Sequence, residues 1–326
     1  MKAIVVTAFG KPEVLKYVDM DIPSIKPNQL LIKVVKASVN FADVKARYGK
    51  KGGGNFPFIP GLDAAGIIVD VGSVVKRFKA GQRVIAFPPK GSYAEYVVSD
   101  ENLTFEIPDS IDFDVAAACP TVSFLSYKLL ADIARIREGE SVLVHSAAGG
   151  VGTTAIQMAK LLGAGMVVGT VGSEAKVAAA KQAGADQVIC YENEGFPNQV
   201  NELTNGKGVD IVLDSIAGKV TEESLNCLAL YGRLVQFGNS SGQVGSFRTA
   251  DIHTSCRSVL GFSLGTTRKH RPELLGDTAS KVFQYLENGD LNMNIGHHFS
   301  LEDAPIAHEL IESRMSTGKI LLHVSD

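Results

Sequence analysis

The stretch VLVHSAAGGVG, residues 142–152, constrains the fold more than any other part of the sequence. It is an apolar run that ends in small residues and glycines, and the helical pattern TTAIQMAKLLG follows at once. A turn of this kind suits a pyrophosphate that approaches the backbone amides at the start of a helix. Gly149 and Gly152 match two glycines of the GxGxxG pattern, and Ala147 replaces the first. The turn predicts a dinucleotide-binding unit, with an ordinary strand-to-helix turn as the alternative.

Two rhythms divide the chain. The first part, to about residue 110, holds short β-type runs separated by Gly and Pro, which indicates a compact antiparallel, barrel-like unit. From about Asp112, apolar strands alternate with helical stretches, the pattern of βαβ units on a parallel sheet. Within this part the helical stretch TEESLNCLAL, residues 221–230, is expected to precede the strand RLVQFG.

The C-terminal part predicts helices at 277–288 and 301–313 and a final strand at 318–324. No linker or repeat separates it from the rest, so we expect it to pack back on the first unit. The nucleotide-binding unit is then an insertion within the other domain. The fold class is α/β, a β-rich domain with a doubly wound parallel-sheet domain.

The charge and the cysteines of the chain limit the kinds of binding partner and the cellular location that we expect. The net charge is −3, from 32 basic and 35 acidic residues without long runs, which argues against a nucleic-acid partner. The four cysteines lie far apart and form no CxxC pair, so they indicate reduced thiols. The N-terminus does not read as a leader, and no apolar stretch reaches membrane-spanning length. We expect a cytoplasmic protein with small-molecule partners.

The residues that would meet the adenosine ribose favour NADPH. About 20 residues beyond the last motif glycine, an NAD site carries an acid for the ribose hydroxyl. Here Gly172 and Ser173 stand at that point, and Lys176 follows one helical turn later. Charge-assisted contacts predict a preference for NADPH over NADH of about 10- to 100-fold. The alternative is that Lys176 is a solvated surface lysine.

The motifs AAGGVG, GTVGSEAK, VDIVLDS, GRLVQFGNSSG, PGLDAAGIIVDVG and GSYAEYVV together resemble the quinone oxidoreductase (zeta-crystallin-like) branch of the medium-chain dehydrogenase/reductases. The resemblance extends over essentially the whole chain. It implies a GroES-like catalytic domain at residues 1–118 and 258–326. It also implies a Rossmann NADPH-binding domain at residues 119–257.

The resemblance also implies cofactor contacts, residue by residue. Those for the pyrophosphate turn are Ala148, Gly149, Gly150, Val151 and Gly152. Those for the adenosine end are Gly172, Ser173, Lys176, Tyr191 and Ile216. Those for the nicotinamide end are Phe237, Gly238, Asn239, Phe262 and Leu264. For Phe237 and Phe262, plain core packing is the alternative.

Zinc-dependent relatives hold their metal with a cysteine and a histidine at positions that this chain fills with Asn40 and Leu62. An amide and an alkyl group do not replace a thiolate and an imidazole as zinc ligands, so we expect no metal. His297 and His298 are neighbours in sequence, and adjacent residues point to opposite sides of a strand. They are not expected to form a metal site either.

The absent groups indicate the chemistry. Ala42 stands where zinc alcohol dehydrogenases place a hydroxyl that relays the alcohol proton, so alcohol oxidation lacks both electrophile and relay. Quinones and α,β-unsaturated carbonyls need neither. Asn40 is the expected catalytic residue, positioning the substrate oxygen or the nicotinamide carboxamide, with loop capping as the alternative. Asp43 and Arg47, four residues apart, are expected to form a structural ion pair.

Several positions near the expected substrate site depart from relatives. Leu125 and Ser126 replace a Thr-Val or Thr-Ala pair, and Thr121 or Ser123 is a candidate substitute for the lost hydroxyl. Lys45 stands where some relatives have a tyrosine, with Tyr48 three residues later. The glycine-rich loop from Lys50 to Asn55 either shapes the pocket or is a surface loop without a role.

Other functions and an assembly state stay open at this stage. The same hydride step would serve an enoyl-thioester or alkenal reductase, and a protein that binds NADPH with little catalysis is a further alternative. The apolar segment RSVLGFSLG, residues 257–265, resembles the edge strand through which relatives form homodimers. The alternative is that the chain's own tail covers this strand.

Overall fold

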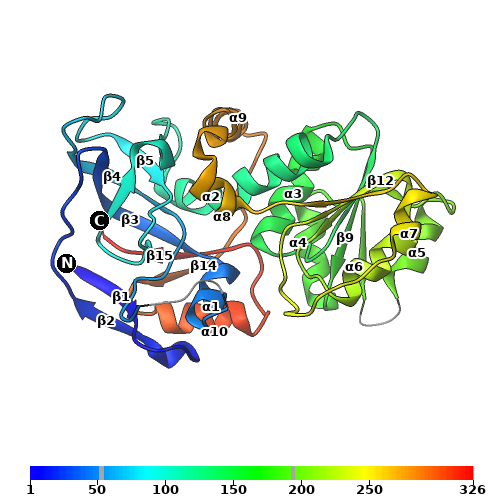
Figure 1. The fold of residues 1–326 in the computed structure, drawn as a ribbon, viewed down its shortest axis with the longest axis horizontal. Helices are drawn as coiled ribbons and strands as arrows, with labels where there is room; N and C mark the ends of the chain where they lie inside the picture. The colour runs from blue at the N-terminus through cyan, green and yellow to red at the C-terminus, as the bar shows by residue number, and fades with distance from the viewer. Residues whose placement is uncertain (51–54, 192–194, 326) are drawn as a thin grey trace. The chain divides into compact units, whose positions relative to one another are not determined.

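The structure is a computed structural model that describes residues 1–50, 55–191 and 195–325 (Figure 1). The chain divides into two compact units. Unit 1 comprises Met1–Thr121, Thr267–Gly289 and Ile295–Asp326, and unit 2 comprises Val122–Thr266 and Asp290–Asn294. The domain boundaries inferred from the resemblance, at 118 and 258, stay a prediction. Within the described residues, no helix is long and apolar enough to cross a membrane.

Unit 1 is built on a mainly antiparallel sheet with seven strands in the described residues. Its order is β14-β15-β3-β4-β5-β7, and β6 also pairs with β3. The strands are β3 (Gln29–Val39), β4 (Ala64–Val71), β5 (Arg83–Ala86), β6 (Tyr96–Asp100), β7 (Thr104–Glu106), β14 (Ile295–Ser300) and β15 (Lys319–His323). A separate pair holds β1 (Lys2–Val6) and β2 (Leu15–Asp19).

The end of the chain returns to unit 1 through β15. This strand pairs antiparallel with β3, with Ile320 opposite Val39, and parallel with β14. Both ends of the chain therefore contribute to one core, which includes Ile32, Val34 and Leu322. The register also brings Lys319, the first residue of β15, beside the end of β3.

Helices complete unit 1. They are α1 (Phe41–Arg47), α9 (Gly276–Glu287) and α10 (Ala304–Glu312), with α2 (Phe113–Tyr127) and α8 (Leu264–His270) crossing the unit boundaries. The helices expected at 277–288 and 301–313 are confirmed by α9 and α10. A stretch of π-helix, Lys128–Ala134, follows α2 directly.

Unit 2 contains a sheet of six parallel strands in the described residues, in the order β10-β9-β8-β11-β12-β13. They are β8 (Ser141–Val144), β9 (Met166–Val171), β10 (Gln187–Cys190), β11 (Val209–Asp214), β12 (Leu228–Gln236) and β13 (Ser258–Gly261). The strand order reverses between β8 and β11, as in a doubly wound Rossmann sheet. This confirms the parallel-sheet prediction for this part of the chain.

Helices cover both faces of this sheet. Figure 1 shows α3 (Gly150–Leu161) and α4 (Val177–Gln182) on one side of the strands, with α5 (Phe196–Leu203), α6 (Lys219–Ser224) and α7 (Thr249–His253) on the other. The inner strands are consequently buried almost throughout; Val142 and Leu143 of β8 have no exposed surface. Strands covered on both faces are apolar runs rather than alternating ones, which is the pattern this sequence shows.

One expected helix ends too late. The segment 221–230 was expected to be helical, but α6 ends at Ser224 and β12 begins at Leu228. Leu228 pairs with Val209 of β11 and is buried. Residues 228–230 therefore belong to β12, although their local propensity suits a helix. Tertiary pairing outweighs a propensity difference of well under about 1 kcal/mol per residue.

Candidate active site

The turn between β8 and α3 has the geometry that a pyrophosphate requires. Gly149 is the N-cap of α3 and offers no side-chain acceptor to the first turn of the helix. A Cβ at Gly149 would meet only the Ser146 carbonyl oxygen, at 3.5 Å, whereas a Cβ at Gly152 would lie 2.3 Å from that oxygen. The absence of a side chain at Gly152 thus lets α3 lie close to the turn. The absence of one at Gly149 leaves the first backbone N–H groups of α3 accessible to a ligand. The residues present fit a dinucleotide phosphate.

The remaining residues expected to contact the cofactor follow the carboxyl ends of the other strands. They are Gly172, Ser173 and Lys176 after β9, Tyr191 after β10, Ile216 after β11, Phe237, Gly238 and Asn239 after β12, and Phe262 and Leu264 after β13. Because the strands are parallel, their carboxyl ends share one edge of the sheet. This is the edge at which open α/β sheets bind ligands, beside the point where the strand order reverses.

At two points along this edge of the sheet, the segments that follow neighbouring strands lie close together. The Tyr191 hydroxyl lies 3.6 Å from the position of a Cβ on Gly172, so the ends of β9 and β10 meet there. A Cβ on Gly238 would lie 2.8 Å from the Ser215 carbonyl oxygen, so only glycine lets the loop after β12 approach the loop after β11. Lys176 is half-buried at the end of a short 3-10 helix whose N-cap position is Ser173.

Asp214 organises the end of β11, and the sequence analysis missed it. Its carboxylate accepts hydrogen bonds from the backbone N–H groups of Ile216 and Ala217, at 2.8 and 3.0 Å, and from the Thr221 hydroxyl. The residue is fully buried. It fixes the turn that carries Ile216. The available signal was an acid at the end of the apolar run VDIVLD, where burial demands partners.

Asn40 caps α1 and is only 7% exposed. Its Nδ2 donates to Asp63 Oδ1 at 3.1 Å and makes longer contacts, of 3.3 and 3.4 Å, with the hydroxyl and carbonyl oxygens of Ser38. Its Oδ1 accepts a hydrogen bond of 2.8 Å from Lys319 Nζ. The expected catalytic amide thus lies between a buried carboxylate and a buried lysine, neither of which the sequence analysis singled out.

Asp43 contacts the backbone of Asn40 and belongs to the same buried group of polar residues as Asp63 and Lys319. Its Oδ2 accepts the backbone N–H of Asn40 at 2.9 Å and the Tyr93 hydroxyl at 3.1 Å. Tyr93 in turn lies 3.2 Å from His308 Nε2. Burial raises the pKa of Asp43 to about 7, and the nearby Asp63 adds to the rise. Burial lowers the pKa of His308 to about 3, so this imidazole is neutral at physiological pH.

The expected ion pair between Asp43 and Arg47 is wrong. Arg47 is fully buried and pairs with Glu312 of α10, at 2.5 Å, while its Nη1 lies 3.2 Å from His308 Nδ1. The two side chains are on one helix, but the Asp43 carboxylate accepts the backbone N–H of Asn40, the N-cap residue of α1. The packing of α10 against α1 offers Arg47 a better partner than a helix neighbour, whose pairing is worth only about 0.2–0.5 kcal/mol.

The residues at the position of the zinc ligands do not fit a metal ion. Leu62 carries no donor atom, and the Asn40 oxygen already faces the cation of Lys319. A second cation against that oxygen would meet direct repulsion. Across the described residues, no group of three or more His, Cys, Asp and Glu side chains could hold a metal. His297 is half-buried and His298 exposed on β14, which places the two imidazoles on opposite sides of the strand.

The substitute hydroxyls near α2 differ in their surroundings. The Ser123 hydroxyl contacts the Met293 sulfur at 3.5 Å. The hydroxyls of Thr121 and Ser126 are buried and have no hydrogen-bond partner among the described residues. Of the two candidate substitutes, Thr121 and Ser123, only Thr121 has a hydroxyl without a partner among the described residues, and its contact with the cofactor stays a prediction.

The segment around the expected substrate loop is only partly described. Tyr48 donates to Glu312 at 2.5 Å, so its hydroxyl is held within unit 1, and Lys45 is half-buried. Of the loop expected to shape the pocket, residues 51–54 lie outside the described residues.

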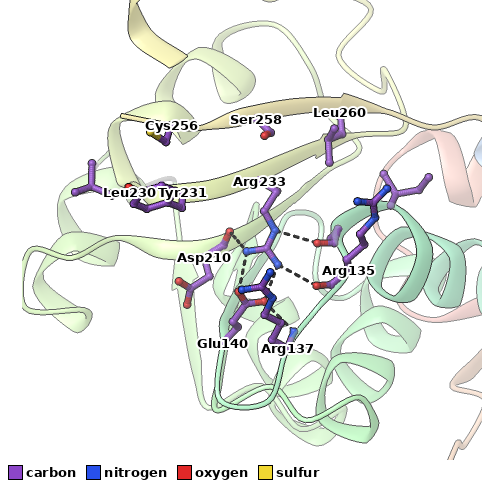
Figure 2. A pocket seen from close by; sticks show the side chains of 12 residues that line it. Arg135, Arg137, Glu140, Asp210, Leu230, Tyr231, Arg233, Cys256, Ser258 and Leu260 are labelled. Atoms are coloured by element: carbon purple, nitrogen blue, oxygen red, sulfur yellow. Dashed lines mark hydrogen bonds and ion pairs between the residues drawn. The ribbon is translucent and has the colours of Figure 1, made fainter. Parts of the chain in front are cut away.

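A cavity of about 490 Å³ in unit 2 lies elsewhere on the sheet (Figure 2). Its lining includes Glu140 just before β8 and Asp210 near the start of β11, so it opens at the amino-terminal end of the strands. Figure 2 shows Arg233 at its centre, where the guanidinium contacts both Glu140 oxygens, at 2.6 and 2.9 Å. The positive charge of Arg233 is thus neutralised by Glu140. Because the cavity lies at the amino-terminal end of the strands, it is not the nucleotide site, which is expected at their carboxyl ends.

Comparisons with known proteins identify the family. Residues 26–109 match the alcohol dehydrogenase GroES-like domain, and residues 150–280 match the zinc-binding dehydrogenase domain. A quinone oxidoreductase of Pseudomonas aeruginosa is 37% identical, covering 98% of this chain and 99% of its own. Two solved structures each have a TM-score of 0.93 and 34% identity. One is a quinone oxidoreductase of Pseudomonas syringae pv. tomato, covering 99% of each chain, and the other is that of Escherichia coli complexed with NADPH, covering 99% of this chain and 100% of its own.

The fold and these relatives define a medium-chain dehydrogenase/reductase with a GroES-like domain and a Rossmann domain. Within this superfamily, the chain belongs to the quinone oxidoreductase branch. It is an oxidoreductase, as the resemblance implied.

The raised pKa of Asp43 predicts a pH-dependent effect of Asp43→Asn on stability. In the unfolded chain this carboxyl ionises near pH 4, and in the folded protein near pH 7, so its contribution is fully present below about pH 4 and is lost as the pH rises through 7. Relative to wild type, the free energy of unfolding of Asp43→Asn should therefore increase between pH 4 and 8, by up to about 4 kcal/mol. Urea unfolding at several pH values measures this.

Burial also lowers the pKa of His308 and of His145, the buried histidine that follows β8, but it does so in both proteins, so their contributions cancel in this comparison. The exposed Asp21→Asn is the control and should show a small difference at every pH. A difference between Asp43→Asn and wild type that does not vary with pH would show that the carboxyl ionises normally when folded.

Proposed function

We propose that the protein is a zinc-independent, NADPH-dependent reductase that transfers hydride to quinones or similar electrophilic α,β-unsaturated carbonyl compounds. The observation that carries this proposal is the buried contact between Asn40 and Lys319 at the position where zinc-dependent relatives bind their metal. A site with that amide and that ammonium has no room for a Lewis-acid ion. Acceptors that are already electrophilic need none.

The cofactor proposal follows from the sheet edge and from relatives crystallised with NADPH. Backbone N–H groups of Gly150 and Val151 bind the pyrophosphate at the start of α3. Ser173 and Lys176 hold the 2′-phosphate. The adenosine lies beside Tyr191 and Ile216, and the nicotinamide is bordered by Phe237, Gly238, Asn239, Phe262 and Leu264.

When bound, NADPH supplies the hydride. The chain's own part is to position the acceptor and to stabilise the negative charge that develops on its oxygen. Asn40 does this through an N–H of its side-chain amide, a preorganised dipole in a site from which water is largely excluded. No side chain is required to relay a proton, because solvent can protonate the product oxygen.

Reduced thiols support a cytoplasmic location. Cys119, Cys190 and Cys227 are buried and free, and burial raises the pKa of Cys227 to about 12, so this thiol stays protonated. The formal charge of −3 continues to argue against nucleic-acid partners. We therefore propose a small-molecule enzyme of the cytoplasm.

An acceptor panel tests the reaction. NADPH absorbance is followed with 1,4-benzoquinone, 9,10-phenanthrenequinone, an alkenal and an enoyl thioester, with and without a chelator. The proposal expects oxidation of NADPH with the quinones at a rate that the chelator leaves unchanged. Faster turnover of the alkenal or the thioester would assign the alternative reductase activity. Tight NADPH binding without turnover on any acceptor would leave a cofactor-binding protein.

Cofactor preference tests the 2′-phosphate contacts. The wild type should bind NADPH about 10- to 100-fold more tightly than NADH, since charge-assisted hydrogen bonds contribute about 1.5–3 kcal/mol. Lys176→Met should remove most of this preference and leave the Kd for NADH unchanged. Lys181→Met, on the following helix, is the matched control, because Lys181 donates to the Asp186 carbonyl oxygen instead. Equal Kd values for both cofactors in the wild type would refute the assignment.

We further propose a homodimer formed through β13, the outermost strand of the sheet in the described residues. Beside it, Leu230 and Tyr231 of β12 are 66% and 72% exposed, and they line the cavity shown in Figure 2. An exposed edge strand next to large apolar side chains is a surface that a second copy would cover.

Sedimentation tests this assembly. At micromolar concentration the wild type should have twice the 34.6 kDa mass of the chain, and Leu230→Asp should shift it toward the monomer. Leu203→Asp, on α5 beside β10 at the opposite end of the sheet, should have no such effect. A wild type that sediments as a monomer would contradict the proposal.

A further inference from the structure

The environment of the Asn40 amide determines its orientation. Lys319 Nζ is a donor only, and it contacts Asn40 Oδ1 at 2.8 Å and the Val39 carbonyl oxygen at 3.4 Å. On the other side, Asp63 Oδ1 accepts from Asn40 Nδ2 at 3.1 Å. A lysine cannot accept a hydrogen bond from the amide nitrogen, and a carboxylate cannot donate to the amide oxygen. Only one of the two flipped states of this amide satisfies both neighbours.

Asp63 is itself held firmly. It has no exposed surface, its Oδ1 also accepts the Ser38 hydroxyl at 2.6 Å, and its Oδ2 accepts the backbone N–H of Thr121 at 3.0 Å. Lys319 is equally constrained, because it begins β15 and is 3% exposed. Both groups that orient Asn40 are thus fixed by the sheet and by α2, so the amide has little freedom to rotate.

The lysine also affects the strength of the amide as a donor. A positive charge on a carbonyl oxygen draws electron density from the amide and strengthens its N–H groups as hydrogen-bond donors. Of the two N–H groups of Asn40, one has the carboxylate of Asp63 as its acceptor. The contacts of Nδ2 with Ser38 are long, 3.3 and 3.4 Å, and are the weaker ones that a substrate oxygen would replace.

Burying an ammonium carries a free-energy cost. Desolvation lowers the pKa of Lys319, and the groups that oppose this are Asp63, Asp43 and Cys119. A buried donor that costs stability and contacts the one expected catalytic amide indicates a role in orienting that amide.

We propose that Lys319 is a positioning residue for hydride transfer, acting through Asn40: together with Asp63, it fixes the amide in the orientation that presents N–H groups, and it strengthens them as donors. The inference rests on the proposed function, in which Asn40 donates to the substrate oxygen. Lys319 itself contacts neither substrate nor cofactor in this account.

A double-mutant cycle tests the inference. The hydride step is measured by single-turnover decay of NADPH absorbance with 9,10-phenanthrenequinone, in the presence of a chelator, for wild type, Lys319→Met, Asn40→Ala and the double variant. Lys319→Met should slow the step about 10- to 100-fold, the factor that a hydrogen bond to a charged group represents. The double variant should be no slower than Asn40→Ala. The Kd for NADPH should stay unchanged, which a general structural defect would not allow.

Lys36→Met is the matched control, because Lys36 lies on β3 opposite β15 and pairs with Asp114 rather than with Asn40. It should leave the rate unchanged. If Lys319→Met slows the step by the same factor with and without Asn40, or does not slow it, the inference is wrong. If Asn40→Ala runs at the wild-type rate, the inference is wrong as well.

A second readout does not depend on turnover, so it separates this inference from the proposed function. The side-chain amide protons of Asn40 are assigned in ¹⁵N spectra by their loss in Asn40→Ala, and their exchange with water is measured. Lys319→Met should accelerate this exchange, and Lys319→Arg, which keeps a donor, should not. Unchanged exchange in Lys319→Met would overturn the inference even in an active enzyme. If Lys319→Met does not fold, Lys319→Leu, which also lacks a donor, replaces it in both experiments, with the same expected directions.

Discussion

A carboxylate buried without water must find hydrogen-bond donors inside the protein, and this requirement organises both units. In unit 1, Asp63 joins the end of β3 to the middle of α2 by accepting from Ser38, Asn40 and Thr121. In unit 2, Asp214 shapes the turn after β11 in the same way. Neither residue is exposed. The two carboxylates therefore hold chain segments in place beside residues that are proposed to act on the substrate and the cofactor.

The same electrostatic logic underlies the proposal that this reductase works without a metal. Where its zinc-dependent relatives use an ion to polarise an oxygen, this chain provides an amide held between a lysine and a carboxylate. Such a group is weaker than a metal ion, and it suits acceptors whose carbonyl carbon or conjugated double bond is already electron-poor. The proposed substrate class thus follows from the strength of the hydrogen-bond donor that the site supplies.

The sequence predicted the parallel sheet and the turn between β8 and α3 well, because those features are local. Small residues between an apolar strand and a helix have few other uses, and Gly152 does lie where a Cβ would collide with the turn. The alternation of apolar strands with helices likewise indicates a sheet that is covered on both faces. The helix boundary near Leu228 was missed because pairing with β11 decides it, and pairing is not visible in a short window of sequence.

The buried polar network was beyond the sequence for a similar reason. Lys319 and Asn40 are 279 residues apart, and only the pairing of β15 with β3 brings them together. Arg47 appeared to have a partner at Asp43, but its partner is Glu312, which comes from a helix near the end of the chain. Residue types alone indicated the absence of zinc ligands. They did not indicate which groups replace them.

The central claim is direct hydride transfer from NADPH without a metal. The most direct measurement is the primary isotope effect on quinone reduction in single turnovers of chelator-treated enzyme, with NADPH deuterated at either position of nicotinamide C4. The account predicts full reduction after chelation and a primary isotope effect with one of the two labelled epimers only. Loss of reduction on chelation, or the absence of an isotope effect with both epimers, would contradict it.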